Sequence, residues 1–294
     1  MQDAKSVDTS PEAIAGEGAL KQSAMEVFRK APALCQPEHG CLHYHRLWPV
    51  ARLAKSTGPA LAGVEFFEQQ LGRLNYSSQI RILIFGAADT GLLATLCQCL
   101  GPEYKAVQFI LVDRCATVIW QNECFAKCLG LDIEFIQADL QSLEIQPVDV
   151  IVAHSILNFF GEAARLEILA MWRTLLRKEG MVLLSNSVYA EEGQRFRKIH
   201  PRFNSERVLK FAQQNAYSLD DLEQMENAFE ICKNEGMQVY TPAAEKVFLQ
   251  QITCARLHIQ VCNRHPVTPE QQGPISSLTS VPKLRLECCL TRAC

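Results

Sequence analysis

The chain has 294 residues, of which 48% are hydrophobic and 21% charged, and this composition suffices for a substantial apolar core. A formal net charge of −3 argues against a dedicated nucleic-acid-binding protein, because such proteins usually carry a basic excess. No apolar run approaches the roughly 18–20 residues needed to span a bilayer, and the polar N-terminal segment does not resemble a secretion signal. We therefore expect a cytoplasmic protein without membrane or nucleic-acid partners. A homodimer is compatible with these properties.

Residues 1–75 are predicted to form a helical cap that precedes the first strand. Residues 1–10 are polar and are expected to be disordered. Glu12–Lys30 and Pro59–Leu74 carry apolar residues at helical spacing. Between these two helices lies the segment Cys35–Trp48, which is unusually rich in histidine and cysteine.

Residues 76–263 alternate between strand and helix patterns, which predicts a doubly wound, mostly parallel, seven-stranded α/β sheet. The first strand is followed by the glycine turn Gly86–Gly91 and by leucines at helical spacing, which end at Gly101. The predicted strands are Ile80–Phe85, Val107–Asp113, Ile133–Ile136, Val148–His154, Gly180–Ser187, Lys246–Ile252 and Ala255–Cys262.

Two segments interrupt or follow this core. Residues 194–236 are predicted to be a helical insertion on the substrate side, with a helix over Asn204–Gln214 and a second helix capped by Ser218 and Asp221. From Asn263 onward Pro, Gln, Ser and Gly dominate, so residues 264–294 are predicted to be a flexible tail.

The thirteen cysteines are scattered along the predicted helices and strands, where we expect them to behave as small buried apolar residues. Their odd number and the absence of a signal sequence argue against a disulfide framework. The three cysteines near the C-terminus, Cys288, Cys289 and Cys294, have no spacing typical of metal ligands.

Polar residues follow the carboxyl ends of the predicted strands, and ligands bind open α/β sheets at that edge, where the strand order reverses. Gly86 allows a sharp turn and close approach of a ligand, because it has no Cβ. Asp113 after the second strand can accept hydrogen bonds from both ribose hydroxyls, and Asp139 after the third can accept one from an adenine amino group. Phe159 and Phe160 can form a wall. These residues together predict a nucleoside site.

Five segments, Ile82–Gly91, Leu111–Asp113, Gln137–Asp139, Asp149–His154 and Leu176–Leu184, resemble successive motifs of class I S-adenosylmethionine-dependent methyltransferases of the small-molecule type. The resemblance covers about residues 78–190. It implies S-adenosylmethionine as cofactor, with Gly86 and Gly91 flanking the methionine end, Asp113 on the ribose and Asp139 near the adenine. The implied cofactor-binding residues are Gly86, Ala87, Ala88, Gly91, Asp113, Arg114, Asp139, Leu140, His154 and Ser155.

The sequence departs from the family pattern at the glycine turn, where Ala87 and Ala88 occupy the region of a central glycine. The segment Ser155–Phe160 lacks the carboxylates that the metal-dependent catechol-type branch needs. The Asn-Pro-Pro-Tyr type of loop, which serves exocyclic amines of nucleic acids, is also absent. The segment His39-Gly-x-x-x-x-x-Arg46-Leu47-Trp48 resembles the helical cap of small-molecule methyltransferases, and this resemblance implies a small-molecule acceptor.

His154 and His39 are the candidate catalytic bases, since an imidazole has an ordinary pKa of about 6.5. Packing is the alternative role for both. Arg197 belongs to a basic run that suits a carboxylate or phosphate of the substrate, and a solvated helix face is an equal alternative. The predicted substrate-binding residues are Glu38, His39, Tyr44, Trp48, Asn158, Phe159 and Arg197.

A metal site is the alternative for the histidine- and cysteine-rich segment, because Glu38, His39, Cys41, His43 and His45 include good zinc ligands. Their spacing matches no closed motif, and alternate side chains on a helix or strand diverge. We therefore predict no metal and expect this segment to face the substrate or to pack.

Taken together, these patterns predict an enzyme that transfers a methyl group to an O, N, S or C atom of a small molecule, with a role in specialised metabolism. A nicotinamide-dependent oxidoreductase is one alternative, although it would favour the motif Gly-x-Gly-x-x-Gly, which is absent. A non-catalytic cofactor-binding or scaffold protein is the other alternative, suggested by the reduced glycine turn.

Overall fold

The computed structural model of the chain describes residues 11–56, 64–190, 204–235, 243–267 and 283–293. The predicted disorder of residues 1–10 lies outside this range. The helices are α1 (Pro11–Leu34), α2 (Leu42–Leu53), α3 (Val64–Leu71), α4 (Gly91–Leu100), α5 (Ala116–Leu129), α6 (Glu162–Leu175), α7 (Ser205–Gln214), α8 (Leu219–Glu235) and α9 (Glu245–Cys254), with short 3-10 turns η1 (Pro37–His39), η2 (Gly101–Ala106) and η3 (Ile156–Phe159). The strands are β1 (Ile80–Phe85), β2 (Val107–Asp113), β3 (Ile133–Gln137), β4 (Val148–His154), β5 (Leu176–Tyr189), β6 (Leu257–Pro266) and β7 (Lys283–Arg292).

The strands form one seven-stranded sheet in the order β3-β2-β1-β4-β5-β7-β6. Strands β1 to β5 pair in parallel, whereas β7 pairs antiparallel with both β5 and β6. The strand order reverses between β1 and β4, which places a topological switch point at the carboxyl ends of these two strands. The predicted doubly wound, mostly parallel, seven-stranded sheet is confirmed.

Two predictions about the C-terminal region are wrong. Residues 245–254 form helix α9 instead of a strand, because Phe248, Ile252 and Ala255 recur at helical spacing and are buried on one face. Residues 283–292 are not a flexible tail but strand β7, whose Leu286 and Leu290 are completely buried. The predicted boundary at residue 263 also falls inside β6.

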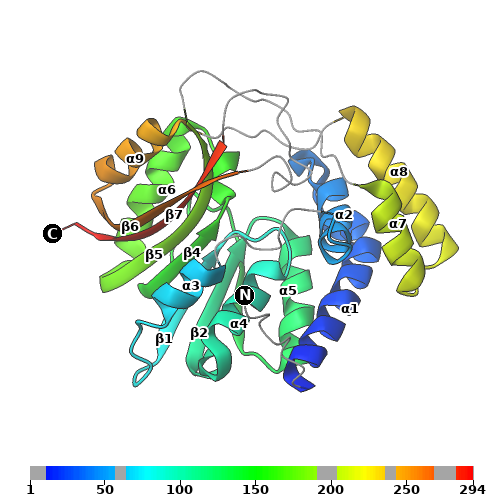
Figure 1. Cartoon of the computed structure of the whole chain (residues 1–294), viewed down its shortest axis with the longest axis horizontal. Coiled ribbons are helices and arrows are strands. Elements are labelled where there is room, and N and C mark those ends of the chain that lie inside the picture. The colour runs from blue at the N-terminus through cyan, green and yellow to red at the C-terminus, as the bar shows by residue number, and fades with distance from the viewer. Residues whose placement is uncertain (1–10, 57–63, 191–203, 236–242, 268–282, 294) are drawn as a thin grey trace, which may run out of the picture.

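Helices cover both faces of the sheet, as the alternation of strand and helix predicts (Figure 1). One face packs against α6 and α9, around the fully buried Trp172 and Phe248. The other face packs against α3, α4 and α5, around Phe67, Leu96 and Phe125. Because strands β1, β2 and β4 are buried on both faces, their sequences are almost continuously apolar.

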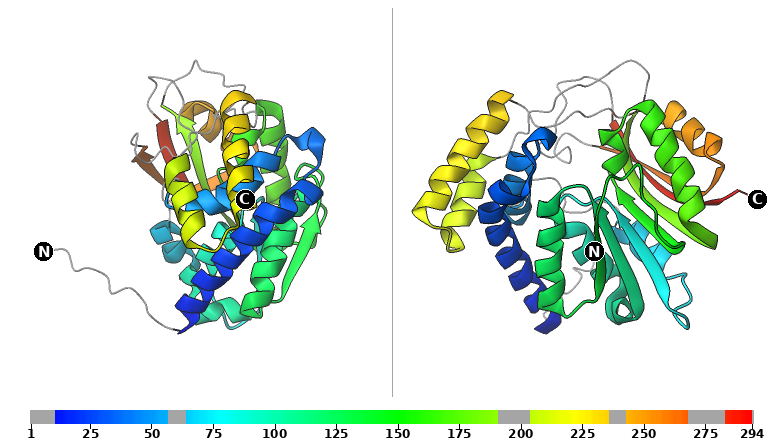
Figure 2. Two further views of the ribbon diagram at one scale, coloured as in Figure 1. Left: turned by 90° about the vertical axis from the view of Figure 1, so that its right-hand side faces the viewer. Right: turned by 180° about the vertical axis from the view of Figure 1, so that it is seen from behind.

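Four helices from two distant segments form the cap. Helices α1 and α2 pack against α7 and α8 around an apolar cluster that includes Phe28, Leu47 and Met225. Figures 1 and 2 show α7 and α8 on the outer side of α1 and α2, away from the sheet. Helix α3 belongs instead to the layer on the sheet, so the cap is not the uninterrupted segment 1–75 that the sequence predicts.

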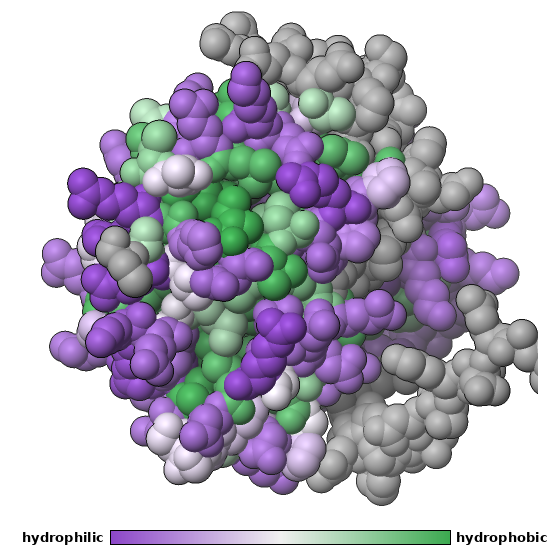
Figure 3. Space-filling model, turned by 60° about the vertical axis from the view of Figure 1, so that its left-hand side comes forward, coloured by the Kyte–Doolittle hydropathy of each residue, from purple (hydrophilic) through white to green (hydrophobic). Residues whose placement is uncertain are grey.

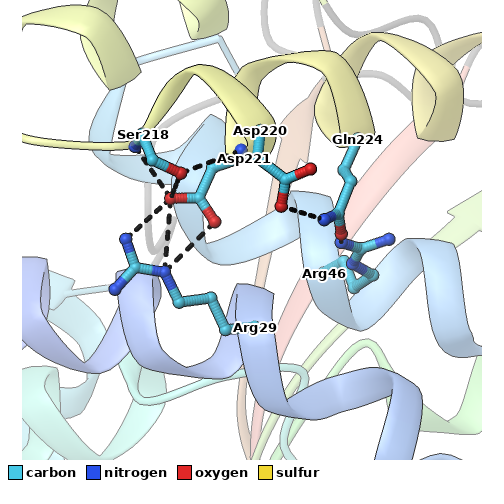
Figure 4. A network of polar contacts seen from close by, with 6 residues as sticks. All are labelled: Arg29, Arg46, Ser218, Asp220, Asp221 and Gln224. Atoms are coloured by element: carbon cyan, nitrogen blue, oxygen red, sulfur yellow. Dashed lines mark hydrogen bonds and ion pairs between the residues drawn. The ribbon is translucent and has the colours of Figure 1, made fainter.

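A polar network holds α8 against the two N-terminal helices (Figure 4). The carboxylate of Asp221 accepts hydrogen bonds from Nε and Nη2 of Arg29, at 3.1 and 2.7 Å. The predicted capping box is present, since Ser218 Oγ accepts a hydrogen bond from the backbone N–H of Asp221 (3.1 Å). Arg46 of α2 donates to Gln224 of α8 at 2.6 Å.

Figure 3 shows one face of the molecule from the side of the sheet edge, with apolar atoms gathered between polar side chains. Met181 of β5 and Val261 of β6 are only partly buried. No helix among the described residues is both long and apolar enough to cross a bilayer.

Candidate functional site

The turn after β1 requires glycine at residue 86. Gly86 adopts φ +75°, in the left-handed region that favours glycine. A Cβ at this position would lie 2.8 Å from the side chain of Ile156 and 3.3 Å from that of Leu140. The backbone N–H of Gly86 donates to the carbonyl of Val112 (2.9 Å), so the turn stays attached to β2.

Asp113 joins the ends of β1 and β2. Its Oδ2 accepts a hydrogen bond from the backbone N–H of Ala87 (3.0 Å), and its Oδ1 accepts one from the N–H of Cys115 (2.8 Å). Burial raises the pKa of this carboxyl, and the two backbone hydrogen bonds oppose the rise. A carboxylate offers about four acceptor positions. Asp113 therefore keeps acceptor capacity at the edge of the sheet where the strand order reverses.

Asp89 is a residue of this turn that sequence reasoning missed. It is 2% exposed, its Oδ1 accepts a hydrogen bond from the N–H of Gly91 (2.8 Å), and its Oδ2 lies 2.6 Å from Nε of Arg52. The Arg52 guanidinium occupies the space that a Cβ at Gly91 would need. The Arg52 side chain alone therefore explains why residue 91 is a glycine. Contact between Gly91 and the cofactor stays a prediction.

The remaining residues predicted to bind the cofactor differ in exposure. Ala87 and Ala88 are half-buried, and Leu140 is buried beside the turn. Arg114 and Asp139 are exposed. Oδ1 of Asp139 accepts a hydrogen bond from the N–H of Gln141 (2.9 Å), which shapes the loop after β3. An adenine contact of Asp139 stays a prediction.

Polar side chains of β5 and β7 align with His154, the last residue of β4. His154 is in register with Ser185, and Ser185 with Glu287, so all three lie on the same face of the sheet. Nε2 of His154 and Oγ of Ser185 are buried and have no hydrogen-bond partner among the described residues. Ser185 and Glu287 were not predicted. The alternation of leucine with charged residues over 283–287 is the signal that could have identified β7 and Glu287.

Burial and, to a lesser extent, the positive charges of Arg285 and Arg52 together lower the pKa of His154 to about 3. The imidazole is therefore neutral near pH 7, so each ring nitrogen has a defined role as donor or acceptor. A base with such a low pKa accepts a proton poorly, which favours a hydrogen-bonding role for His154 over the predicted role of general base.

Hydrogen bonds to β5 hold the loop after β4 in place. Ser155 adopts φ +56°, and its N–H donates to the carbonyl of Ser185 (2.7 Å). Asn158 is completely buried, and its Oδ1 accepts a hydrogen bond from Asn186 (3.1 Å), so its side chain supports the loop. Phe159 is half-buried.

The cap brings part of the predicted substrate-binding set to the same edge. Tyr44 of α2 stacks on Trp48, with ring centroids 5.0 Å apart. Ala88 of the turn packs against the apolar cluster that contains Tyr44. Burial raises the pKa of Tyr44, and the negative charges of Asp89 and Asp113 raise it further. Glu38 is exposed and His39 half-exposed in η1. Arg197 lies outside the described residues.

Comparisons with known proteins find the same architecture only in solved structures. No protein-family model matches the chain, and no curated protein matches it. A S-adenosylmethionine-dependent methyltransferase from Clostridium acetobutylicum is similar with a TM-score of 0.50 and 11% identity, over 79% of this chain and 91% of that one. A geranyl diphosphate methyltransferase in complex with geranyl diphosphate and sinefungin has a TM-score of 0.50 and 12% identity, over 78% and 76%. The mitomycin 7-O-methyltransferase has a TM-score of 0.49 and 12% identity, over 97% and 69%.

This is the fold of class I S-adenosylmethionine-dependent methyltransferases. At such low identities the similarity shows the fold alone. Within the methyltransferase fold, this chain places Gly86 and Asp113 at the switch point and His154 and Ser185 beside it. Helix α2 of the cap reaches the same edge through Arg52, which pairs with Asp89, and through the cluster of Tyr44, which packs against Ala88.

Proposed function

We propose that the chain is a S-adenosylmethionine-dependent methyltransferase that acts on a small molecule. Asp113 is the single observation that carries this proposal. Its carboxylate lies at the end of β2, is fixed by the N–H of Ala87 in the turn after β1, and keeps acceptor positions for a pair of ribose hydroxyls. The fold supports the same conclusion, because the methyltransferases named above share it.

The residues around Asp113 suit a nucleoside cofactor. Gly86 turns the backbone at the edge of the sheet, and the side chains of Leu140 and Ile156 next to it provide an apolar wall for a base. Nε2 of His154 and Oγ of Ser185 are buried polar atoms without partners among the described residues, and such atoms favour a bound group that supplies hydrogen bonds.

When bound, S-adenosylmethionine supplies a methyl group that is already activated on its sulfonium. The protein then has to hold the acceptor atom in line with that methyl group and to exclude water. Asp113 and Gly86 would fix the nucleoside end. Helix α2 would cover the site through Tyr44 and Trp48, and neutral His154 would orient a polar group of the acceptor.

Isothermal titration calorimetry with S-adenosylmethionine, S-adenosylhomocysteine and NAD tests this proposal. We expect binding of the first two ligands and none of NAD. In Asp113→Asn, the amide presents an NH₂ group where the carboxylate accepts, so the Kd for S-adenosylhomocysteine should rise about 10- to 100-fold.

Asp132→Asn is the matched control, because Asp132 is exposed and lies at the amino end of β3, at the opposite edge of the sheet. It should bind S-adenosylhomocysteine as the wild type does, and circular dichroism should show that both variants are folded. Binding of NAD alone would support an oxidoreductase. No heat with any of the three ligands would support a scaffold protein and contradict the proposal.

A further inference from the structure

Three cysteines and one histidine meet beside the carboxyl end of β2. Sγ of Cys115 lies 3.7 Å from Sγ of Cys35, 3.8 Å from Sγ of Cys41 and 3.2 Å from Nδ1 of His45. Sγ of Cys35 lies 3.5 Å from Nδ1 of His45. All four atoms lie within 4.8 Å of one another. This is the composition of a metal-binding group.

The fold brings these residues together from three segments. Cys41 precedes α2 and His45 lies four residues later, joined to it by the bond from His45 N–H to the Cys41 carbonyl (3.0 Å), so both side chains share one face of the first turn. Cys35 follows the end of α1, where its N–H donates to the carbonyl of Ala31 (2.8 Å). Cys115 lies between β2 and α5, two residues after Asp113.

The distances fit a tetrahedral ion. Bond lengths of about 2.3 Å for Zn–S and 2.0–2.1 Å for Zn–N give tetrahedral edges of ~3.8 Å between two sulfurs and ~3.6 Å between sulfur and nitrogen. Sγ of Cys115 lies 3.7 and 3.8 Å from the other two sulfurs, and the S–N distances to His45 are 3.5 Å from Cys35 and 3.2 Å from Cys115. The other two pairs of ligand atoms lie within 4.8 Å. If the cysteines were merely packed as apolar side chains, their sulfurs and the histidine nitrogen would not need to lie at these distances from one another.

The surroundings also suit thiolates. Cys115 stands at the N-cap position of α5, where the helix N-terminus stabilises negative charge. Oγ1 of Thr117, completely buried, lies 3.0 Å from Sγ of Cys35 and can donate a hydrogen bond to it. Cys41 and Cys115 are 1% and 2% exposed, so bulk water would compete little with these ligands.

We propose that Cys35, Cys41, His45 and Cys115 bind a zinc ion. The site has four protein ligands and no open position, so the ion is structural. It would hold the segment that joins α1 to α2 against the carboxyl end of β2, next to Asp113. This inference goes beyond the proposed function and does not depend on it.

Sequence spacing alone did not reveal this site. The rejected alternative placed all ligands within residues 38–45, where Glu38, His39 and His43 do not join the group. Only Cys41 and His45 of that set belong to it, and the helix makes them converge. The fourth ligand lies 70 residues after His45, so its approach depends on the tertiary fold.

Two measurements on the wild type test the proposal without any variant. The full chain is purified under reducing conditions, stripped with a chelator and titrated with Co²⁺. We expect one Co²⁺ per chain, with the intense visible bands of a tetrahedral site and thiolate-to-cobalt charge transfer in the near ultraviolet. Zn²⁺ should displace Co²⁺ stoichiometrically, and X-ray absorption of the zinc form should show three sulfur ligands and one nitrogen ligand.

Variants then identify the ligands. Cys41→Ala and Cys115→Ala should each lose the cobalt spectrum and bind Zn²⁺ at least 100-fold more weakly. Cys232→Ala is the matched control, since Cys232 is equally buried but lies in the cap core away from the group. It should keep the metal. Zn²⁺ should raise the Tm of the wild type and of Cys232→Ala but not that of Cys115→Ala.

Three results would overturn the proposal. The first is a wild type that shows no tetrahedral cobalt spectrum, a result that does not depend on whether any variant folds. The second is a Cys115→Ala protein that keeps stoichiometric zinc with an unchanged spectrum. The third is a disulfide between Cys115 and either Cys41 or Cys35, detected by mass spectrometry in protein prepared without reductant. This result overturns the proposal if the protein still binds no metal after the disulfide has been reduced.

Discussion

Arg52 of α2 forms an ion pair with Asp89 in the turn after β1, with Nε and Oδ2 2.6 Å apart. The side chains of Arg52 and Asp89 are only 14% and 2% exposed, so neither charge is well solvated. Because α2 belongs to the cap and Asp89 to the sheet domain, this pair connects the two parts at the edge where we place the cofactor. The cap is thus positioned by charge as well as by apolar contact.

Removing Arg52 should destabilise the protein strongly. Arg52→Ala leaves the buried Asp89 carboxylate without its cation, and breaking a buried pair in this way typically costs about 3–5 kcal/mol. Urea unfolding at pH 7 measures the loss. Arg207→Ala, which removes an exposed arginine of α7, should change stability by less than about 0.5 kcal/mol. Equal stabilities of the two variants would contradict the role of the pair.

Gly91→Ala should destabilise the protein by about 1–3 kcal/mol, because the new Cβ overlaps a guanidinium that Asp89 holds in place. Gly18→Ala is the contrasting change. A Cβ at this exposed helical position meets nothing within 4 Å, so the substitution should stabilise the protein by roughly 0.5–1 kcal/mol. In an Arg52→Ala background the cost of Gly91→Ala should largely disappear, and strict additivity in this double-mutant cycle would refute the explanation.

Acid should destabilise the wild type through His154. The pKa of His154 is about 3 in the folded protein, below the ordinary value of about 6.5, so the unfolded chain binds the extra proton as the pH falls below 6.5. Stability from this group is complete above that pH and decreases toward pH 3. Between pH 7.5 and 5.5 we expect a loss of about 1 kcal/mol that His154→Gln lacks. His258→Gln, at an exposed histidine, should retain the wild-type dependence.

Helix α8 should be held less firmly against the cap when Arg29 is replaced. Hydrogen bonding to Arg29 lowers the pKa of Asp221 to about 2, so this contact is complete above an ordinary carboxyl pKa and is lost as the pH falls toward 2. In Arg29→Ala, hydrogen exchange of α8 amides at pH 7 should accelerate about fivefold, which corresponds to ~1 kcal/mol. Glu230→Gln, which breaks only an exposed pair with Lys233, should leave exchange unchanged.

The parallel half of the sheet was predictable because its signals are local. The glycine turn directly follows the apolar run Ile80–Phe85, and Asp113 directly ends the apolar run of β2. Parallel strands then bring these ends to one edge without further information. The capping box of Ser218 and Asp221 was equally local, and it was confirmed.

The errors have physical causes. Residues 246–252 contain Val, Phe and Ile, which favour strands, but the burial of Phe248 and Ile252 on the α6 side decides for a helix. Strand β7 follows a segment rich in Pro, Gln and Ser, which concealed the alternation of Leu284 and Leu286 with charged residues. The contacts of Arg52 with Asp89 and of His45 with Cys115 join distant segments, and no spacing rule predicts them.

Strand β7 lies between β5 and β6, although it follows both along the chain. During synthesis, one edge of β5 therefore stays unpaired until residues 283–292 emerge from the ribosome. Until then β6 also lacks the strand with which it pairs in the described structure. Early release of an incomplete chain would leave β5 free to pair with another molecule. Completion of the sheet thus waits for residues 283–292, and until they are made the open edge of β5 is a site for aggregation.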